Sequence, residues 1–237
     1  MDLLIKLIYS ILKTYRLNVF EEGETLKKKY TAKEVRNLIL DTASVLFIEK
    51  GYEQTSISDI VAGLDGLTRG AIYHHFESKY HIIVGIARRF IPEQDVLDAV
   101  DRRDDWNGLE KIQALLLEGM FNEDITKTTV VSWALLKDAT FVSIYNTQMC
   151  EAMLPIIEKY IYTGIEDGSI TVPQPKQMAE IVLLITTTWF IEALFPSTVE
   201  AFFEKLKAAQ YVLKQSGIDV ISEDVLSIII SKLTAST

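Results

Sequence analysis

The sequence predicts an all-α protein, with a three-helix unit near the amino terminus followed by a larger helical part. Three observations support this fold class. Apolar residues recur at helical spacing almost throughout the 237 residues, alternating strand patterns are missing, and there are only 11 glycines and 5 prolines. A chain of this length can bury a substantial core without disulfide bonds.

Cysteine content and hydropathy indicate the compartment. Cys150 is the single cysteine, so an intramolecular disulfide is impossible and a reducing cytoplasm is the simplest location. We expect its thiol to pack as a small hydrophobe, with a reactive thiol as the alternative. Lys6 and Lys13 interrupt the apolar start, which argues against a secretory signal. The longest charge-free apolar run, residues 181–191, is shorter than the ~20 residues of a membrane span, so we expect no membrane partner.

Charge is distributed unevenly along the chain. The formal net charge is −9, which by itself argues against a polyanionic partner. Residues 27–90, however, hold ten Lys and Arg against seven Asp and Glu, whereas residues 91–237 hold eleven against twenty-two. A locally basic segment on an acidic body indicates a local contact with nucleic acid.

The first predicted helix lies in "TAKEVRNLILDTASVLFIEKG", residues 31–51. Thr31 and Glu34 have the spacing of a capping box, and Gly51 ends the helix. One apolar stripe runs along it, formed by Val35, Leu38, Ile39, Thr42, Ala43, Leu46 and Phe47.

Two shorter helices follow. Ser56 and Asp59 repeat the capping spacing at the start of the second, and Asp65-Gly66 reads as a turn. Thr68 can cap a third helix that runs through Phe76. Three helices with tight connections, the last two joined by a glycine-containing turn, predict a helix-turn-helix unit.

The later helices are longer. Pro196 and Gly217 are among the residues that mark their boundaries, and Ser197 with Glu200 is expected to cap the helix that follows Pro196. The expected helices span residues 79–90, 107–122, 126–146, 148–167, 174–195, 198–216 and 223–233.

The third helix presents two different faces. Ile72 and Phe76 fall one turn apart and are expected in the small core. The other face suits the DNA major groove, because Arg can bond guanine edges in two places, Gly permits close approach and a Tyr hydroxyl can reach a phosphate. That face consists of Arg69, Gly70, Tyr73, His74 and Glu77.

The segments "GYEQTSISDIV" and "GLTRGAIYHHFESK" resemble the DNA-binding region of TetR-family transcriptional repressors over residues 31–85. The resemblance implies a homodimer that binds a double-stranded DNA operator through a homeodomain-like helix-turn-helix and is released by a small-molecule inducer. One extra residue, Asp65 or a neighbour, separates the second and third helices here, which makes the base contacts less secure than the phosphate contacts. The residues carried over as DNA contacts are Ser56, Thr68, Arg69, Gly70, Tyr73, His74 and Lys79.

The chain is expected to divide into an amino-terminal extension (1–30), a helix-turn-helix DNA-binding domain (31–78) and a ligand-binding and dimerisation domain (79–237). Other interpretations of the first ninety residues stay open. His74 and His75 could form a metal pair, although adjacent helical residues diverge; we expect His75 to pack internally. Tyr73 could be plain surface, and residues 27–29 could be a solvated lysine run or an arm touching phosphate.

About thirty residues precede the first helix, more than is usual in the TetR family. "FEEGETL" can be encoded by a purine-rich ribosome-binding sequence followed by a TTG start, so we hypothesise that translation begins at Leu26. The rival interpretation is an amphipathic arm for a membrane or partner, with an apolar side formed by Leu3, Leu4, Leu7, Ile8, Ile11 and Leu12.

The acidic body could be a ligand receptor, an enzyme or a protein-interaction module. Motifs for catalysis, metal or cofactor binding are missing, so we expect a regulator without catalytic residues or cofactor. Aromatic residues recur on two predicted helices, which is typical of core packing and equally of an apolar ligand pocket. The pocket candidates are Trp133, Lys137, Asp138, Phe141, Tyr145, Trp189 and Glu192.

Two apolar helices near the carboxyl end, in residues 176–194 and 197–215, would pair with their copies in a four-helix dimer interface, as the resemblance implies. A two-fold dimer requires a pseudo-palindromic operator whose half-sites lie about 34 to 36 Å apart.

Overall fold

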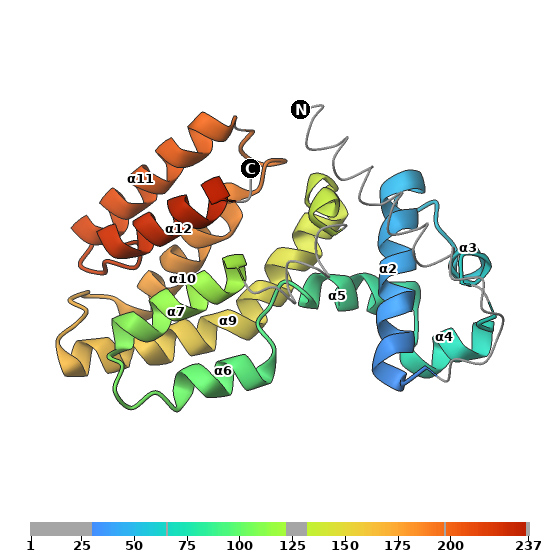
Figure 1. Cartoon of the computed structure of the whole chain (residues 1–237), viewed down its shortest axis with the longest axis horizontal. Helices are drawn as coiled ribbons and strands as arrows, with labels where there is room; N and C mark the ends of the chain where they lie inside the picture. Colours follow the sequence, from blue (N-terminus) through green and yellow to red (C-terminus); the bar gives the residue numbers. More distant parts are fainter. Residues whose placement is uncertain (1–29, 65, 122–131, 197, 236–237) are drawn as a thin grey trace. The chain divides into compact units, whose positions relative to one another are not determined.

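The computed structural model describes residues 30–64, 66–121, 132–196 and 198–235, and every regular element in these ranges is a helix (Figure 1). The expected all-α class is therefore confirmed. The described residues form two compact units that divide within one helix, after Ile86. The first unit also takes in residues 132–135, and the second holds the rest.

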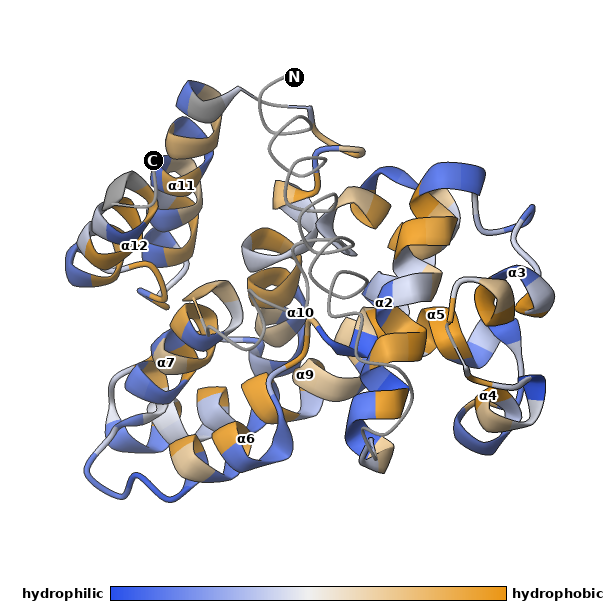
Figure 2. Ribbon diagram, turned by 45° about the vertical axis from the view of Figure 1, so that its right-hand side comes forward, coloured by the Kyte–Doolittle hydropathy of each residue, from blue (hydrophilic) through white to orange (hydrophobic). Residues whose placement is uncertain are grey.

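Within the described residues, the first unit contains three whole helices and most of a fourth. Hydrophobic and hydrophilic residues alternate around the longest of them, so that one side faces the core (Figure 2). Ile39, Ile60 and Ile72 come from three different helices and are fully buried. The helices are α2 (Ala32–Lys50), α3 (Ile57–Ala62), α4 (Arg69–His75) and α5 (Lys79–Arg88).

The helix starts of the first unit follow the predicted caps. Thr31 and Glu34 form the capping box of α2, and Ser56 and Asp59 form that of α3. The Thr68 hydroxyl accepts a hydrogen bond from the Ala71 N–H and begins α4. These local hydrogen bonds satisfy backbone donors that have no partner within the helix.

The connections between these helices are tight. Thr55 is buried and its hydroxyl donates to the carbonyl oxygens of Gly51 (2.8 Å) and Leu46 (3.2 Å), which closes the turn after α2. Gly66, between α3 and α4, has φ +76°, a conformation that favours glycine. Helix α3 ends at Ala62, and the proposed extra residue, Asp65, lies outside the described residues.

The second unit contains longer helices. Among them, α10 packs against α9 and α7 also packs against α9. The α-helices are α6 (Gln94–Asp101), α7 (Gly108–Phe121), α9 (Ala139–Asp167), α10 (Pro175–Thr186), α11 (Val199–Gln215) and α12 (Glu223–Ala235). There are also two 3₁₀ helices, η1 (Ser132–Lys137), whose first four residues are assigned to the first unit, and η2 (Thr188–Phe190). Among the described residues, none of the helices is both long and apolar enough to cross a membrane.

Helix α9 corrects two predictions. The sequence predicted separate helices over 126–146 and 148–167, but α9 is one 29-residue helix that passes through Pro155. Asp138 caps its start, so residues 132–137 form a 3₁₀ turn instead of joining it. Residues 126–131 lie outside the described part. Helix α6 was missed because it has eight residues and no side-chain cap.

Helix α10 ends earlier than expected, at Thr186 instead of residue 195. The hydroxyls of Thr186 and Thr187 donate to the carbonyl oxygens of Val182 (2.7 Å) and Leu183 (2.5 Å). Such back-bonding by threonine competes with the regular backbone pattern and favours a helix end. The cap of α11 is Thr198; the predicted cap, Ser197, lies outside the described residues.

Helices α7 and α9 approach each other at two glycines. A Cβ atom on Gly108 would lie 2.3 Å from the backbone nitrogen of Gly164 and 2.3 Å from the carbonyl oxygen of Tyr160. The Gly108 N–H donates to the Asp167 carboxylate at 2.8 Å. Glycine at this crossing therefore permits backbone contact that a larger residue would prevent.

Candidate nucleic-acid interface

Helix α4 has one buried and one exposed face. Ile72 is fully buried and Phe76, directly after the helix, is 5% exposed, whereas Arg69, Tyr73 and His74 are exposed. The division into a core face and a free face, expected from the sequence, is therefore confirmed. Burial of Ile72 and Phe76 fixes the rotation of α4 and so determines which side chains face solvent.

Arg69 and Tyr73 form a pair on the exposed face. The Arg69 Nη2 donates to the Tyr73 hydroxyl at 3.3 Å, and the guanidinium carbon lies 5.6 Å from the centre of the Tyr73 ring. The two residues are one helical turn apart, so this contact requires only the helix itself. The ring holds the guanidinium plane above the helix surface, where its remaining N–H groups stay available to acceptors.

Gly70 lies between these residues on the exposed side of α4. Among the described residues, a Cβ atom there would meet only the Thr68 hydroxyl, at 3.6 Å, so none of them requires glycine at this position. The absence of a side chain instead leaves the start of α4 open to an approaching surface.

The hydroxyls of Ser56 and Thr68 are exposed and both serve as caps. Ser56 Oγ donates to the Asp59 carboxylate at 2.6 Å and accepts from the Asp59 N–H at 3.1 Å. Lys50 Nζ lies 2.8 Å from the same carboxylate. Hydrogen bonds from Lys50 and then from Ser56 hold the pKa of Asp59 well below its usual range. The sequence predicted the capping box but not the ion pair with Lys50. The Lys50 ammonium offsets the charge of the Asp59 carboxylate beside Ser56.

Lys79 bridges two parts of the first unit. Its ammonium donates to the carbonyl oxygens of Tyr52 (2.7 Å) and Glu53 (3.2 Å) and lies 4.3 Å from the centre of the Tyr52 ring. Lys79, which is predicted to contact DNA, therefore also has an internal structural role, because its ammonium ties the start of α5 to the turn after α2. An ammonium has three donors, so one remains for a phosphate oxygen.

The two adjacent histidines differ in environment. His74 is exposed, while His75 is half-buried. The pKa of His75 is lowered, mainly by burial and to a smaller extent by the nearby charges of His74 and Arg36. Their ring centres are 5.2 Å apart and nearly perpendicular. Within the described ranges, no group of three or more side chains is arranged to hold a metal ion.

Comparisons with known proteins bear on this unit directly. The family model described as "Bacterial regulatory proteins, tetR family" matches residues 39–86. The repressor KstR2 of Rhodococcus jostii (strain RHA1) is 30% identical over 145 residues, which are 56% of this chain and 67% of that protein. The chain belongs to the TetR family of bacterial regulatory proteins. It is thus related to DNA-binding transcriptional regulators.

Other similarities to TetR-family proteins are shorter or weaker. The repressor BepR of Brucella suis biovar 1 (strain 1330) is 35% identical over 97 residues, covering 40% of this chain and only 45% of BepR. A gamma-butyrolactone receptor structure covers 87% of this chain and 99% of its own (19% identity, TM-score 0.56). The structure of NalD, the secondary repressor of the MexAB-OprM multidrug efflux pump in Pseudomonas aeruginosa, covers 78% and 96% (19% identity, TM-score 0.56). These two structures show the shared TetR fold alone.

In this TetR-family chain, the predicted aromatic pocket residues do not share one helix face. Phe141 and Tyr145 are buried in α9 and pack against Phe90, with ring centres 6.1 and 5.3 Å from it. Trp133 and Lys137 lie in η1, so the prediction of one helix over 126–146 that holds all four residues is wrong. Burial also raises the pKa of Tyr145.

The charged members of the predicted pocket have partners in the structure. Lys137 Nζ lies 3.5 Å from the Glu192 carboxylate, and Asp138 accepts a hydrogen bond from the Phe141 N–H at 2.9 Å. Trp189 is half-buried beside Phe190, with ring centres 6.0 Å apart. These side chains thus stabilise the local structure, and a ligand role for them stays a prediction.

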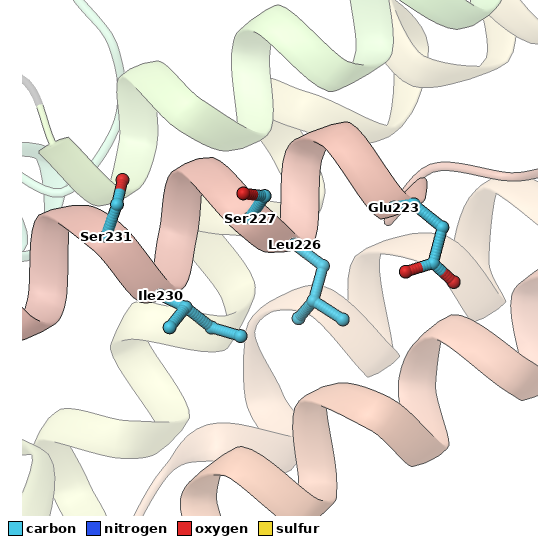
Figure 3. Close-up of a pocket in the computed structure, with 5 residues that line it drawn as sticks. All are labelled: Glu223, Leu226, Ser227, Ile230 and Ser231. Carbon is cyan, nitrogen blue, oxygen red and sulfur yellow. The ribbon is translucent and has the colours of Figure 1, made fainter.

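Two hollows of the second unit contain none of the predicted pocket residues. One, of about 320 Å³, runs along α12, with Leu226 and Ile230 pointing to one side and Ser227 and Ser231 to the other (Figure 3). All of its lining residues come from one helix, so it lacks the converging groups of a ligand site. The other, of about 390 Å³, lies between α9 and α10 and includes Cys150. Cys150 is exposed, so the expectation that it packs internally is wrong.

Proposed function

We propose that the chain is a transcriptional repressor that binds a pseudo-palindromic DNA operator as a homodimer and is released by a small-molecule inducer. The observation that carries this proposal is the exposed Arg69–Tyr73 pair on a helix fixed in place by Ile72 and Phe76. In this account the chain acts in the cytoplasm, on chromosomal DNA, and has no enzymatic activity.

The exposed face of α4 supports direct reading of base edges. Arg69 supplies a planar donor that can bond the O6 and N7 atoms of guanine, and Gly70 allows the backbone to approach the groove. Tyr73 and His74 lie on the same side and are assigned to the DNA backbone and adjacent bases. Base contacts give sequence preference, whereas backbone contacts fix position.

Residues around α4 supply the proposed phosphate contacts. The hydroxyls of Ser56 and Thr68 are exposed at the starts of α3 and α4. Lys79 keeps one ammonium donor beyond its two carbonyl partners. We assign residues 31–78 to DNA binding and residues 79–237 to ligand binding and dimerisation.

The exposed apolar residues of α10 and α11 support dimerisation. Ile181 and Leu184 are 40% and 55% exposed on α10, and Tyr211 and Val212 are 67% and 43% exposed on α11. Exposure of these four large apolar side chains to water costs free energy. Burial against a second copy of the chain would remove this cost. An inducer would then act by favouring a dimer with a different separation of the two reading heads.

Selection of bound fragments from genomic DNA tests this function. We expect an enriched inverted repeat whose half-site centres lie one helical turn or a multiple of it apart. Fluorescence anisotropy with that repeat should show affinity that falls steeply as salt rises, because phosphate contacts release counterions. A chain that enriches no sequence and shows no salt-dependent DNA affinity would contradict the proposal and favour a protein-interaction module.

A further inference from the structure

The hollow between α9 and α10 is a groove with an apolar middle and polar ends. Hydrophobic residues extend along both helices (Figure 2). The groove has a volume of about 390 Å³. Its lining residues are Asn146, Met149, Cys150, Leu154, Glu180, Leu183, Leu184, Thr187 and Thr188.

One hydrogen bond fixes the alignment of the two sides. Thr188 Oγ1 donates to Asn146 Oδ1 at 2.7 Å and joins the amino-terminal part of α9 to the segment after α10. The two helices follow one another along the chain and pack together, so they run antiparallel. Cys150 and Leu184 are each four residues from this hydrogen-bonded pair, and Leu154 and Glu180 are each eight residues from it; all four line the groove. Apolar side chains therefore lie between the two polar ends.

The two ends differ in chemistry. At one end, Asn146 accepts the Thr188 hydroxyl, and its amide nitrogen has no partner among the described residues, so it can donate to a ligand. At the other end, the exposed Glu180 makes no ion pair or hydrogen bond in the described part of the chain. Lys176, one turn before it, instead lies 3.8 Å from Glu158.

We propose that this groove binds an elongated organic cation, with an ammonium group at Glu180, an apolar body along Leu184 and Leu154, and a hydrogen-bond acceptor at Asn146. Glu180 and Thr188, which mark the two polar ends, are eight residues apart, or about 12 Å at the rise of a helix, which sets the length of the ligand. The unpaired carboxylate and the acidic balance of residues 91–237 disfavour an anion. The inference rests on the proposed function, in which this cation is the inducer.

The alkyl series octylamine, octanol and octanoate tests the charge preference without knowledge of the natural ligand. We expect saturable calorimetric binding of one octylammonium per protomer at neutral pH, tighter than octanol, with octanoate weakest. Glu180→Gln should weaken octylammonium about two- to fivefold, the range for a solvent-accessible ion pair, and leave octanol unchanged. Glu166→Gln is the matched control, because Glu166 is exposed on α9 outside the groove. Equal effects of the two substitutions, equal binding of the three probes, or no saturable binding would overturn the inference.

A second copy of the chain is the competing occupant, since Leu184 also lies on the proposed dimer face. Leu154 lines the groove but is not part of the proposed dimer face. Leu154→Lys should therefore abolish octylammonium binding, because it places a like charge in the groove, and should leave the sedimentation behaviour unchanged if the groove holds the ligand. The inference would be overturned if this substitution dissociated the dimer and the parent protein bound no octylammonium. The groove would then belong to the dimer contact.

Operator binding without any probe separates this inference from the proposed function. A protein that binds operator but no octylammonium would overturn the inference while the repressor function stands. A protein that binds octylammonium at Glu180 but no DNA would overturn the repressor function and support the groove as a binding site. Release of operator by octylammonium in the parent protein, with about two- to fivefold more probe needed for release of Glu180→Gln, supports both.

Discussion

At the scale of single residues, Arg69 and Tyr73 divide the proposed recognition of DNA between them. The guanidinium contributes donors that discriminate between bases, and the phenol positions that guanidinium and can reach the backbone. Because the pair is already formed in the free protein, less side-chain freedom is lost on binding.

Substitutions of Arg69 and of Tyr73 should therefore affect DNA binding in different ways. Arg69→Ala is expected to lower discrimination at one base pair by about 1 to 3 kcal/mol, while Tyr73→Phe weakens specific and nonspecific DNA by similar factors. Anisotropy titrations with operator and single-base variants measure both effects. Lys207→Ala, an exposed lysine on α11 paired with Glu204, is the control and should change neither. Unaltered base preference in Arg69→Ala would contradict the groove placement.

Lys79 is expected to contribute to both stability and DNA affinity. Lys79→Ala removes its hydrogen bonds to Tyr52 and Glu53, so the free energy of unfolding should fall by about 1 to 3 kcal/mol. If the third donor meets a phosphate, the slope of log affinity against log salt should also decrease by about 1. Urea unfolding and salt titrations separate these effects. Reduced stability with an unaltered slope would leave Lys79 structural only.

Asp59 should make stability depend on pH. Its pKa is lowered in the folded state, so its contribution is fully present above the unfolded-state pKa of about 3.9. That contribution is lost as pH falls toward the folded-state pKa. Asp59→Asn should therefore destabilise the protein at pH 7, and its difference from the parent should shrink below about pH 3.9. Denaturant titrations across this range measure the difference; a gap that is constant with pH would show that the ion pair with Lys50 contributes nothing.

At the scale of helices, the most demanding packing lies where α7 crosses α9. Gly108 and Gly164 bring the two backbones into contact, so the crossing has no room for a side chain on Gly108. The same helix contains Gly119, where a Cβ atom would meet nothing within 4 Å. One helix therefore provides both a glycine that packing requires and one that it does not.

This contrast yields a paired prediction for unfolding. Gly108→Ala should destabilise the protein by about 1 to 3 kcal/mol, because the helices must separate to admit the methyl group. Gly119→Ala should stabilise it by up to about 1 kcal/mol, because alanine favours the helix. Urea unfolding measures the free energy of unfolding of both variants and of the parent protein. Equal stabilities would mean that α7 and α9 cross less closely than described.

Helix boundaries were predictable from the sequence where local chemistry determines them. The caps at Thr31, Ser56 and Thr68 depend on residues three positions away, and all three are confirmed. The continuity of α9 through Pro155 and the end of α10 at Thr186 depend on packing and on competing hydroxyl bonds. Neighbouring sequence does not reveal such effects, so those boundaries were wrong.

The proposed DNA interface and the groove between α9 and α10 also differed in how far the sequence could predict them. The exposed face of α4 was predictable, because one short helix and its two core residues define it. The carbonyl partners of Lys79 are 26 and 27 residues away, beyond what spacing can indicate. The groove between α9 and α10 was missed because its sides meet only after both helices pack, and Cys150 and Glu180 carry no motif.

At the scale of the whole molecule, the proposed function depends on two copies of the chain acting together. The basic balance of residues 27–90 favours DNA contact, whereas the acidic remainder disfavours nonspecific contact along the duplex. Dimerisation multiplies a modest half-site affinity, because the second half-site binds at high effective concentration.

The proposed dimer face can be tested on α11. Tyr211→Glu places a charge at a position that is 67% exposed, so the folded protomer should tolerate it while the dimer dissociates. Sedimentation equilibrium should show a shift to monomer, and operator affinity should fall. Tyr162→Glu is the control, on an exposed position of α9 outside that face. An intact dimer in the Tyr211→Glu variant would show that the dimer interface does not include this face of α11.

The most direct measurement of the central claim is methylation interference on the selected operator. Guanine N7 lies in the major groove and adenine N3 in the minor groove, so the two modifications report the groove that the protein occupies. With α4 in the major groove, methylation of guanine N7 in each half-site should block binding, and Arg69→Ala should remove that sensitivity at one guanine per half-site. Interference from adenine N3 alone, or guanine interference identical in Arg69→Ala, would contradict the account.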